Sequence, residues 1–395
     1  MAYIPPHKRH SLDKDRPPPV GESIRPLFKK KMSLNATNKS GKIVYANTSI
    51  TTWFAVGLTD NDQFPSHVRL EPVSAESFKH QPGGKYLILV NTNVNEENNE
   101  VSKNCIRSPW ETIASNVQQD LFSSLEILRK GVSYHELEKV KPTLVARFGK
   151  IRFHGIPSVH QNQVNETVLR PLIRSFCTTI PSSYMKNVID EVVQKIGIYF
   201  EEEKDIYHVK LSDNTRTDST VSCKCSVKAD KTLMFYKVEL NLVRQMVADI
   251  SCLDKNLDLR LMLCSKRILT ALTEDEIYSI KEVVSSAVLD SDVKGGLRWP
   301  VGKTSSGDRF SVVGVGHTVT RSYSSPSLRL KVRHADRYDF RRGIGEAGKE
   351  VHMKLKGILS VFLEHGAQND SVSDMLKDSL KLIWDNFLCC EPFLT

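Results

Sequence analysis

The stretch from residue 329 to residue 342 concentrates cationic and aromatic side chains that could bind an anion. Arg329, Lys331 and Arg333 alternate along a predicted strand, and further cations follow it. Guanidinium groups hold phosphates in forked hydrogen bonds, and aromatic rings stack on unpaired bases. A solvated sheet face, in which Asp336 and Asp339 pair with some of the cations, is the competing interpretation. The predicted RNA- or anion-binding residues are Arg329, Lys331, Arg333, Arg337, Tyr338, Phe340, Arg341 and Arg342.

An acidic run offers a second kind of chemistry. In an extended chain Glu201, Glu203 and Asp205 share one face, and alternating carboxylates can hold a divalent metal ion. Together with a basic strand, this run resembles the triphosphate-tunnel metalloenzymes, whose closed antiparallel barrel uses Glu-x-Glu strands. The resemblance implies a metal-dependent phosphohydrolase using Glu201 and Glu203. The chain differs from that pattern at Asp205 and in having Glu239-x-Asn241 as its nearest second acidic strand. A solvated charge run at a strand end is the alternative.

Other catalytic and metal-binding motifs are missing from the sequence. The stretch 302–304 lacks the glycine that a phosphate-binding loop has five residues earlier, where Leu297 stands. No serine–histidine–acid set and no zinc-binding helix can be nominated. The 8 cysteines, Cys223 and Cys225 among them, lack metal-ligand spacing and are predicted to be reduced thiols. The sequence therefore predicts no catalytic residue, no metal and no cofactor, and favours a non-enzymatic protein.

The N-terminal stretch carries a candidate site for a partner protein. Residues 1–41 are rich in proline and cations, hold most of the net charge of +9, and are predicted to form a disordered basic leader. Prolines limit the entropy lost on docking, an aromatic ring supplies buried area, and cations attract polyanions such as nucleic acid. The predicted linear motif consists of Tyr3, Ile4, Pro5, Pro6, His7 and Arg9.

The first ten residues resemble sequences in two groups of known proteins. The sequence Met-Ala-Tyr-Ile-Pro-Pro-His-Lys-Arg-His10 resembles the start of a family of plant proteins of unknown function, which implies no activity. The stretch 3–9 is similar to the Tyr-[Ile/Val]-Pro-Pro-His-Leu-Arg element of RNA-associated proteins, DEAD-box helicases among them. That similarity implies an RNA-processing or translation protein as partner. Lys8 stands where those elements have leucine.

The elements that must position these residues are mainly antiparallel strands. Leu259, Leu261 and Leu263 alternate with polar residues, as do the leucines and valine of 328–332. A period of two indicates a sheet with one buried and one solvated face. Helices are predicted at 108–130, with Ser108 as N-cap, and at 164–176, 182–196, 274–287, 350–365 and 372–388. The predicted fold class is α+β, a mainly antiparallel β-block with covering helices behind the leader.

These expectations give three domains and three function hypotheses. The domains are a leader at 1–41, a small α+β unit at 42–160 and a larger α+β domain at 161–395. The leading hypothesis is a non-enzymatic protein that binds RNA or an RNA-processing partner, and the alternatives are the phosphohydrolase and a scaffold without a nucleic-acid role. No apolar run reaches the ~18 residues of a membrane span, and no DNA-specific motif is present. Nuclear or cytoplasmic location is expected, while the oligomeric state is left open.

Overall fold

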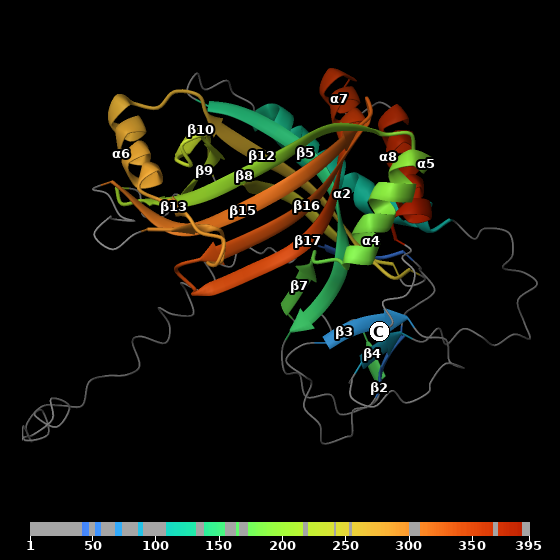
Figure 1. The fold of residues 1–395 in the computed structure, drawn as a ribbon. Coiled ribbons are helices and arrows are strands. Elements are labelled where there is room, and N and C mark those ends of the chain that lie inside the picture. The colour runs from blue at the N-terminus through green and yellow to red at the C-terminus, as the bar shows by residue number, and fades with distance from the viewer. Residues whose placement is uncertain are drawn as a thin grey trace, which may run out of the picture. The chain divides into compact units, whose positions relative to one another are not determined.

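Long antiparallel strands form the centre of the molecule (Figure 1). The structure, a computed structural model, describes residues 42–46, 52–56, 68–72, 86–89, 108–131, 138–154, 163–165, 173–215, 220–240, 242–252, 255–299, 309–365 and 370–388. One continuous ladder runs, in spatial order, through β12 (Asp258–Leu269), β10 (Leu233–Leu240), β9 (Thr220–Val227), β8 (Tyr199–Asp213), β15 (Phe310–Ser324), β16 (Leu328–Asp339), β17 (Ile344–Leu355) and β5 (Glu138–His154).

This ladder closes on itself. Strand β5 pairs with β17 on one side and with β12 on the other, where the register runs from Asp258↔Gly149 to Leu269↔Glu138. Since β12 also pairs with β10, the strands form a closed barrel without free edges among them. Two-faced strands in a closed ring must turn one set of side chains outward and the other set into the ring.

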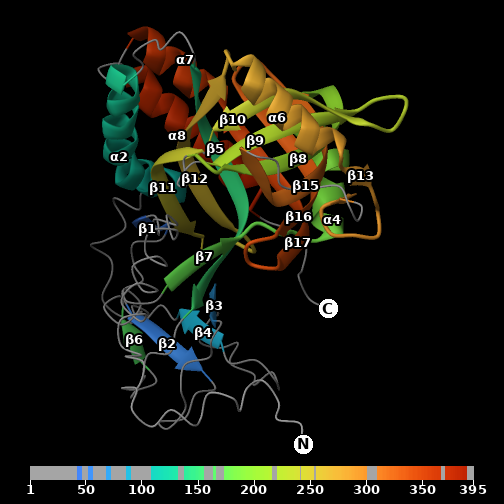
Figure 2. The same ribbon diagram turned by 90° about the vertical axis from the view of Figure 1, so that its left-hand side faces the viewer.

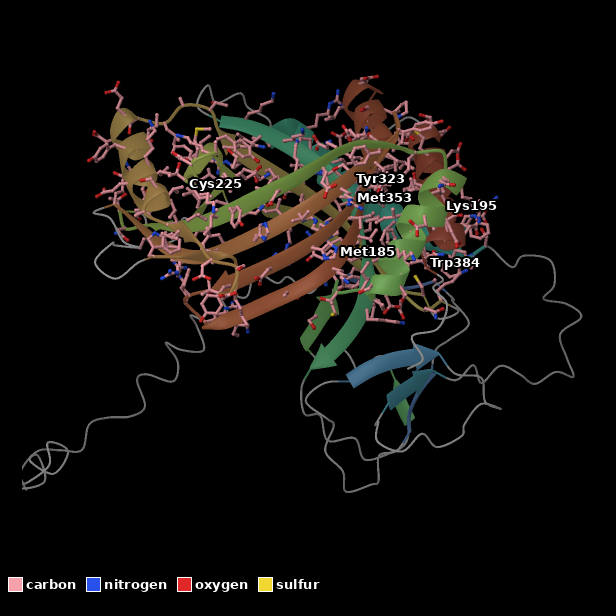
Figure 3. The ribbon with its side chains drawn as sticks, in the orientation of Figure 1. Met185, Lys195, Cys225, Tyr323, Met353 and Trp384 are labelled. Carbon is pink, nitrogen blue, oxygen red and sulfur yellow. The ribbon has the colours of Figure 1, made fainter. Side chains whose placement is uncertain are left out.

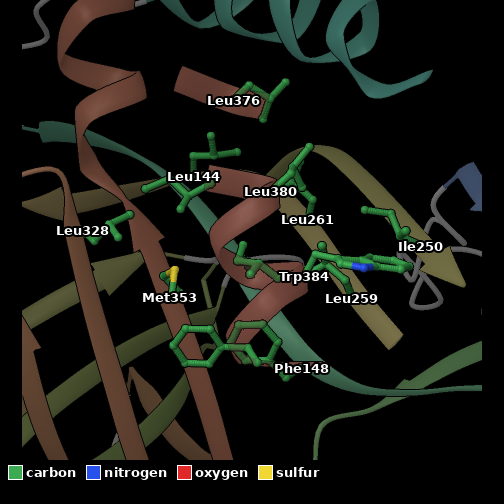
Figure 4. Packing of buried hydrophobic residues seen from close by; sticks show 14 of the residues in the cluster. Leu144, Phe148, Ile250, Leu259, Leu261, Leu328, Met353, Leu376, Leu380 and Trp384 are labelled. Atoms are coloured by element: carbon green, nitrogen blue, oxygen red, sulfur yellow. The ribbon is translucent and has the colours of Figure 1, made fainter. Parts of the chain in front are cut away.

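The apolar faces of these strands point outward. Leu259, Leu261 and Leu263 join Leu330 and Val332 in one large core cluster, as their alternation predicts. Helices cover that cluster at one end of the barrel (Figures 1 and 4): α2 (Pro109–Gly131), α4 (Ser182–Asn187), the π-helical η3 (Val188–Val192), α5 (Val193–Lys195), α7 (Lys356–His365) and α8 (Asp370–Asn386).

A second, smaller core lies on the outer face at the other end. It contains Cys223, Cys225 and Val315 from the strands, covered by Ile280 and Val284 of α6 (Glu274–Ser285). Figure 3 shows Cys225 at this end, and Met353 with Trp384 at the other. The barrel is therefore held from outside by two apolar layers, and its interior is lined mainly by polar side chains.

Ring stacking anchors the C-terminal helix on the barrel. Phe387 is fully buried and stacks on Phe148 of β5, with centroids 5.0 Å apart and planes 9° from parallel. We expect Phe387→Ala to lower the free energy of unfolding by about 3–5 kcal/mol, because it leaves a large cavity in the core. Chemical denaturation measures this loss. Phe200→Ala, at a ring that is 60% exposed, is the control and should change stability by less than about 1 kcal/mol.

The remaining strands extend the sheet beyond the barrel. β1 (Lys42–Tyr45) runs parallel to β11 (Val243–Ser251), which pairs with β12. At the far end of β5 (Figure 2), the ladder continues through β3 (Val68–Pro72), β4 (Tyr86–Leu89), β2 (Thr52–Val56) and β6 (Gln163–Asn165), and β7 (Ile173–Cys177) pairs with β5 outside this order. A two-stranded hairpin of β13 (Val288–Leu289) and β14 (Leu297–Arg298) packs beside α6.

Most predicted elements are confirmed, and two helices are corrected. The α+β class with an antiparallel β-block is confirmed, as are helix α2, whose Ser108 N–H donates to Glu111, and α6 with its Thr273 capping box. The helix predicted at 164–176 is wrong, because that range contains β6 and β7. The helix predicted at 350–365 begins only at Lys356, since 350–355 belongs to β17.

Three other expectations concern organisation. Strand β5 lies within 42–160 yet pairs with strands from 161–395, so the two ranges share one barrel; where a domain boundary falls stays a prediction. Cys223 and Cys225 are free thiols, as predicted, and burial raises the pKa of Cys223 well above its usual value. Among the described helices none has the length and apolar character to cross a membrane.

Candidate functional site

The interior of the barrel is lined with polar side chains, most of them charged, from strands around the ring. These side chains share one space, because cations from several strands lower one another's pKa values. Besides burial, Arg333 of β16 and Lys266 of β12 lower the pKa of His208 of β8. Burial, Lys266 and Lys141 of β5 lower the pKa of Lys354 of β17. Although Arg333 lies deep in the ring, 24% of its side chain remains accessible. The interior set consists of Arg147, His208, Lys224, Lys237, Glu239, Lys266, Arg329, Lys331, Arg333, Arg337, Glu350, His352 and Lys354.

Glu350 is the centre of one interior cluster. One carboxylate oxygen lies 2.7 Å from Arg337 Nη1, and the other lies 3.0 Å from His352 Nε2 and 3.7 Å from Arg333 Nε. Burial alone would raise the pKa of Glu350, but His352 and Arg337 hold that pKa far below its usual range. Burial and Arg333 depress the pKa of His352, so its imidazole is neutral at pH 7. The cluster therefore pairs one carboxylate with two guanidinium groups.

Glu239 is the centre of a second cluster, on the opposite side of the ring. Its carboxylate lies 2.9 Å from Lys237 Nζ, 3.0 Å from Lys224 Nζ and 3.4 Å from Lys266 Nζ. Burial opposes ionisation, but these three ammonium groups lower the pKa of Glu239 to about 2. One negative charge is again shared by several positive ones. The carboxylate of Glu202 at the ring wall likewise lies 2.6 Å from Lys204 and 2.9 Å from Arg329.

Two interior lysines lack such a partner. Within the described part of the chain, no carboxylate lies within 4.0 Å of Lys331 or Lys354. Burial and the neighbouring Arg329 and Arg333 lower the pKa of Lys331 to about 8, and burial with Lys331 and Lys266 lowers that of Lys354 to about 7. A depressed lysine pKa means that burial, together with the neighbouring cations, disfavours the ammonium form. A bound anion would favour that form again by supplying negative charge.

Unsatisfied hydrogen-bonding atoms lie in the same space. Arg147 Nε, Arg333 Nε and Ser322 Oγ are buried without a hydrogen-bond partner in the described structure. A buried donor without a partner is costly, so native proteins usually leave one only where a ligand or water binds. Two guanidinium groups and a hydroxyl in a cation-rich ring are suited to donate hydrogen bonds to a bound oxyanion.

The described acids do not fit a carboxylate-bound divalent metal ion. Glu202, Glu239 and Glu350 are each engaged by cations, and the described residues contain no group of three His, Cys, Asp or Glu side chains placed to hold a metal. The pairing of Glu201 with Glu203 is also corrected. Opposite Ser322 and Tyr323 the register of β8 shifts, so Glu201 contacts Arg329 at 2.7 Å while Glu203 contacts Arg321, on the outer face, at 3.0 Å.

Comparison with known proteins gives a family without an activity. A family model described as a domain of unknown function, DUF7903, matches residues 37–387. The chain belongs to the DUF7903 family. The predicted membership in a family of uncharacterised proteins is thus confirmed, whereas a plant origin and the helicase-like element stay predictions. No curated protein matches this DUF7903 chain.

Several solved structures resemble the DUF7903 chain at low identity. The Pct1 RNA triphosphatase of S. pombe matches with a TM-score of 0.42 and 12% identity over 73% of this chain and 94% of that one. The same enzyme in complex with the Spt5 CTD gives 0.42 and 13% over 72% and 93%. The Mimivirus capping enzyme triphosphatase gives 0.31 and 7% over 68% and 98%.

The predicted anion-binding residues of this DUF7903 chain fall into two sets. Arg329, Lys331, Arg333 and Arg337 line the interior, whereas Tyr338, Phe340, Arg341 and Arg342 lie on the outer face or in the turn that follows β16. Alternation along β16 separates neighbouring residues, so the eight do not form one surface. The linear motif 3–9 lies outside the described residues, and its partner stays a prediction.

Several interior residues were not among the sequence candidates. Arg147, Glu350, His352 and Lys354 line the same ring as the predicted cations. The signal for three of them was present: from 350 to 355, polar residues alternate with Val351 and two other buried apolar residues, as expected for a strand. Arg147 stands alone among apolar neighbours, and a single sequence offers no sign of what it faces.

Proposed function

We propose that this protein binds a condensed phosphate, such as inorganic tripolyphosphate or the triphosphate end of a nucleotide or an RNA, inside the barrel without hydrolysing it. The observation that carries the proposal is the excess of cations over carboxylates on the ring's inner face. Lys331 and Lys354, which have no carboxylate partner, would contact the anion directly. A linear polyanion matches a narrow ring of cations because its charge is repeated along its length.

The donor set supports a proposal of binding rather than hydrolysis. Phosphoryl transfer is commonly assisted by metal ions held on carboxylates. Glu239 and Glu350 inside the ring, and Glu201 and Glu202 at its wall, are each paired with cations. Guanidinium and ammonium groups can hold phosphate oxygens without a metal. The leader and its predicted RNA-processing partner remain compatible with this role, because a triphosphate also occurs at the end of new RNA.

The direct test is calorimetric titration of the full chain with tripolyphosphate in the presence of EDTA. We expect saturable binding that weakens as salt is added, since salt screens charge attraction. Sulfate at the same charge concentration is the control anion and should bind far more weakly. Absence of binding would refute the proposal, and phosphate release on addition of Mg²⁺ or Mn²⁺ would support the hydrolase alternative in its place.

Binding should also take up protons in a narrow pH range. At pH 8 Lys331 and Lys354, with pKa values lowered to about 8 and about 7, are partly neutral. A bound anion raises both pKa values, so we expect uptake of roughly one proton per tripolyphosphate at pH 8 and almost none at pH 6. The dependence of the binding enthalpy on the buffer's ionisation enthalpy measures this number. Equal uptake at the two pH values would contradict the assignment of these lysines.

A further inference from the structure

A second hollow lies outside the barrel, between the hairpin β13–β14 and the outer face of β15 and β16. Its volume is about 640 Å³, and aromatic and cationic side chains stand together in its lining. The residues that matter here are Lys294, Arg298, Trp299, Tyr338 and Phe340. None of the interior cations described above takes part in it. We call this hollow the aromatic pocket.

The walls of the aromatic pocket are fixed by specific contacts. Gly295 and Gly296, with φ of 82° and 73°, allow the tight turn between β13 and β14. The Gly295 N–H donates to Asp336 Oδ2 at 2.9 Å, which ties the hairpin to β16, and Trp299 Nε1 donates to the Val283 carbonyl of α6 at 3.0 Å. The pocket is therefore preformed, as small-molecule sites usually are.

Its aromatic rings meet at steep angles. Phe340 contacts Trp299 at a centroid distance of 6.3 Å and 79°, and Tyr338 at 5.1 Å and 82°. Because the rings do not stack face to face on one another, a flat guest can lie on the face of one ring while its edge meets another. Phe340 is 44% exposed, which is unusual for a phenylalanine and leaves surface for such a guest.

The charges around the pocket favour an anionic guest. Lys294 has no carboxylate within 4.0 Å among the described residues, and Arg298 is paired with Asp290 at 2.6 Å but remains 56% exposed. The turn after β16 adds Arg341, whose Nη2 donates to Ser212 Oγ of β8 at 2.8 Å, and Arg342. Cations thus continue from the pocket to the end of β8, a barrel strand.

We propose that the aromatic pocket binds the nucleobase of a nucleotide whose polyphosphate enters the barrel. The inference rests on the proposed function and narrows the ligand from any condensed phosphate to one that carries a base. Rings that stack combined with exposed cations are the usual pair for an unpaired base and its phosphate. The proline-rich leader of this chain fits less well, because its positive charge repels Lys294 and the arginines.

The test compares ligands with and without a base. Stacking of one base contributes about 1–3 kcal/mol, so ATP or a 5′-triphosphorylated RNA should bind roughly 5- to 150-fold more tightly than tripolyphosphate. Trp299→Ala should abolish that advantage and leave the affinity for tripolyphosphate unchanged. Phe340→Ala, at an exposed position, repeats the test in case Trp299→Ala disturbs folding, and Phe200→Ala is the control. A gain seen only with the RNA would assign the site to RNA ends.

The outcomes separate the two proposals. Equal affinities for ATP and tripolyphosphate, or an advantage that survives both pocket variants, would overturn the nucleobase site and leave the barrel proposal intact. If tripolyphosphate fails to bind, the barrel proposal falls, and a 5′-hydroxyl oligonucleotide then decides the pocket: binding that requires Trp299 supports it, and absence of binding overturns it. A Met1–Val20 peptide that displaces ATP only from the intact pocket would assign it to the leader and also overturn the proposal.

Discussion

Replacing Lys331 and Lys354 together by methionine should stabilise the protein by about 1–4 kcal/mol at pH 7 and abolish its binding of tripolyphosphate. Both ammonium groups are buried among other cations without a carboxylate partner, so the folded state bears the cost of confining them. Methionine fills similar volume and carries no charge. Such a trade of stability for function is expected at a site prepared for a ligand.

The pH dependence gives this prediction a sign that can be checked. At pH 6 and below both lysines are almost fully charged in the folded and unfolded chains, and the cost of burial is present in full. Between the folded pKa values of about 7 and about 8 and the ordinary value of 10.5, the folded chain has released protons that the unfolded chain keeps. The wild type therefore gains stability as pH rises. We expect the advantage of the double variant to shrink from pH 7 to pH 10.

Denaturant titrations of both proteins across this range measure the difference. The buried cysteines, whose pKa values are raised, act in the opposite direction, but they are common to both proteins and cancel in the comparison. Lys281→Met with Lys228→Met, at two exposed positions, is the matched control and should change stability and binding little. A double variant at Lys331 and Lys354 that is less stable than the wild type at pH 7 would show that these cations hold the barrel together.

The strands were predictable because their pattern is local. Leu259, Leu261 and Leu263 had to face a core, and they do so together with Leu330. What lies on the other face was not predictable from alternation, because a strand with polar residues on one side reads the same whether that side meets solvent or the inside of a ring. Closure depends on pairing between β5 and β12, more than 100 residues apart, and no single strand encodes it.

For the same reason, the sequence predicted only some of the residues of the candidate site. Arg329, Lys331 and Arg333 were identified by their spacing, but Glu202, which pairs with Arg329, comes from β8, more than 100 residues earlier in the chain. Glu350, which pairs with Arg333, lies on the next strand, in a range that was predicted to be a helix. The prediction that Glu201 and Glu203 share one face is wrong, because the register shift of β8 breaks the period of two at Glu201. Such a shift, in which one residue has no opposite partner, has no sequence signature here and reverses the face of everything on one side of it.

Glu350→Gln should be the most destabilising conservative change in the interior. The side chain keeps its shape but loses the charge that faces Arg333 and Arg337, and leaving buried cations without their carboxylate costs about 3–5 kcal/mol. Glu346→Gln, at an exposed position on the same strand, is the control and should be nearly neutral.

The acid limb of the stability curve distinguishes charge from shape in this variant. Since the pKa of Glu350 is held far below its usual range, the wild type loses this contribution as pH falls below about 5, where the unfolded chain takes up the proton first. Glu350→Gln should therefore lose stability at pH 7 and show a flatter decline towards pH 3. A parallel decline in the two proteins would mean that the glutamine disturbs packing, and that the interior cations do not depend on this carboxylate.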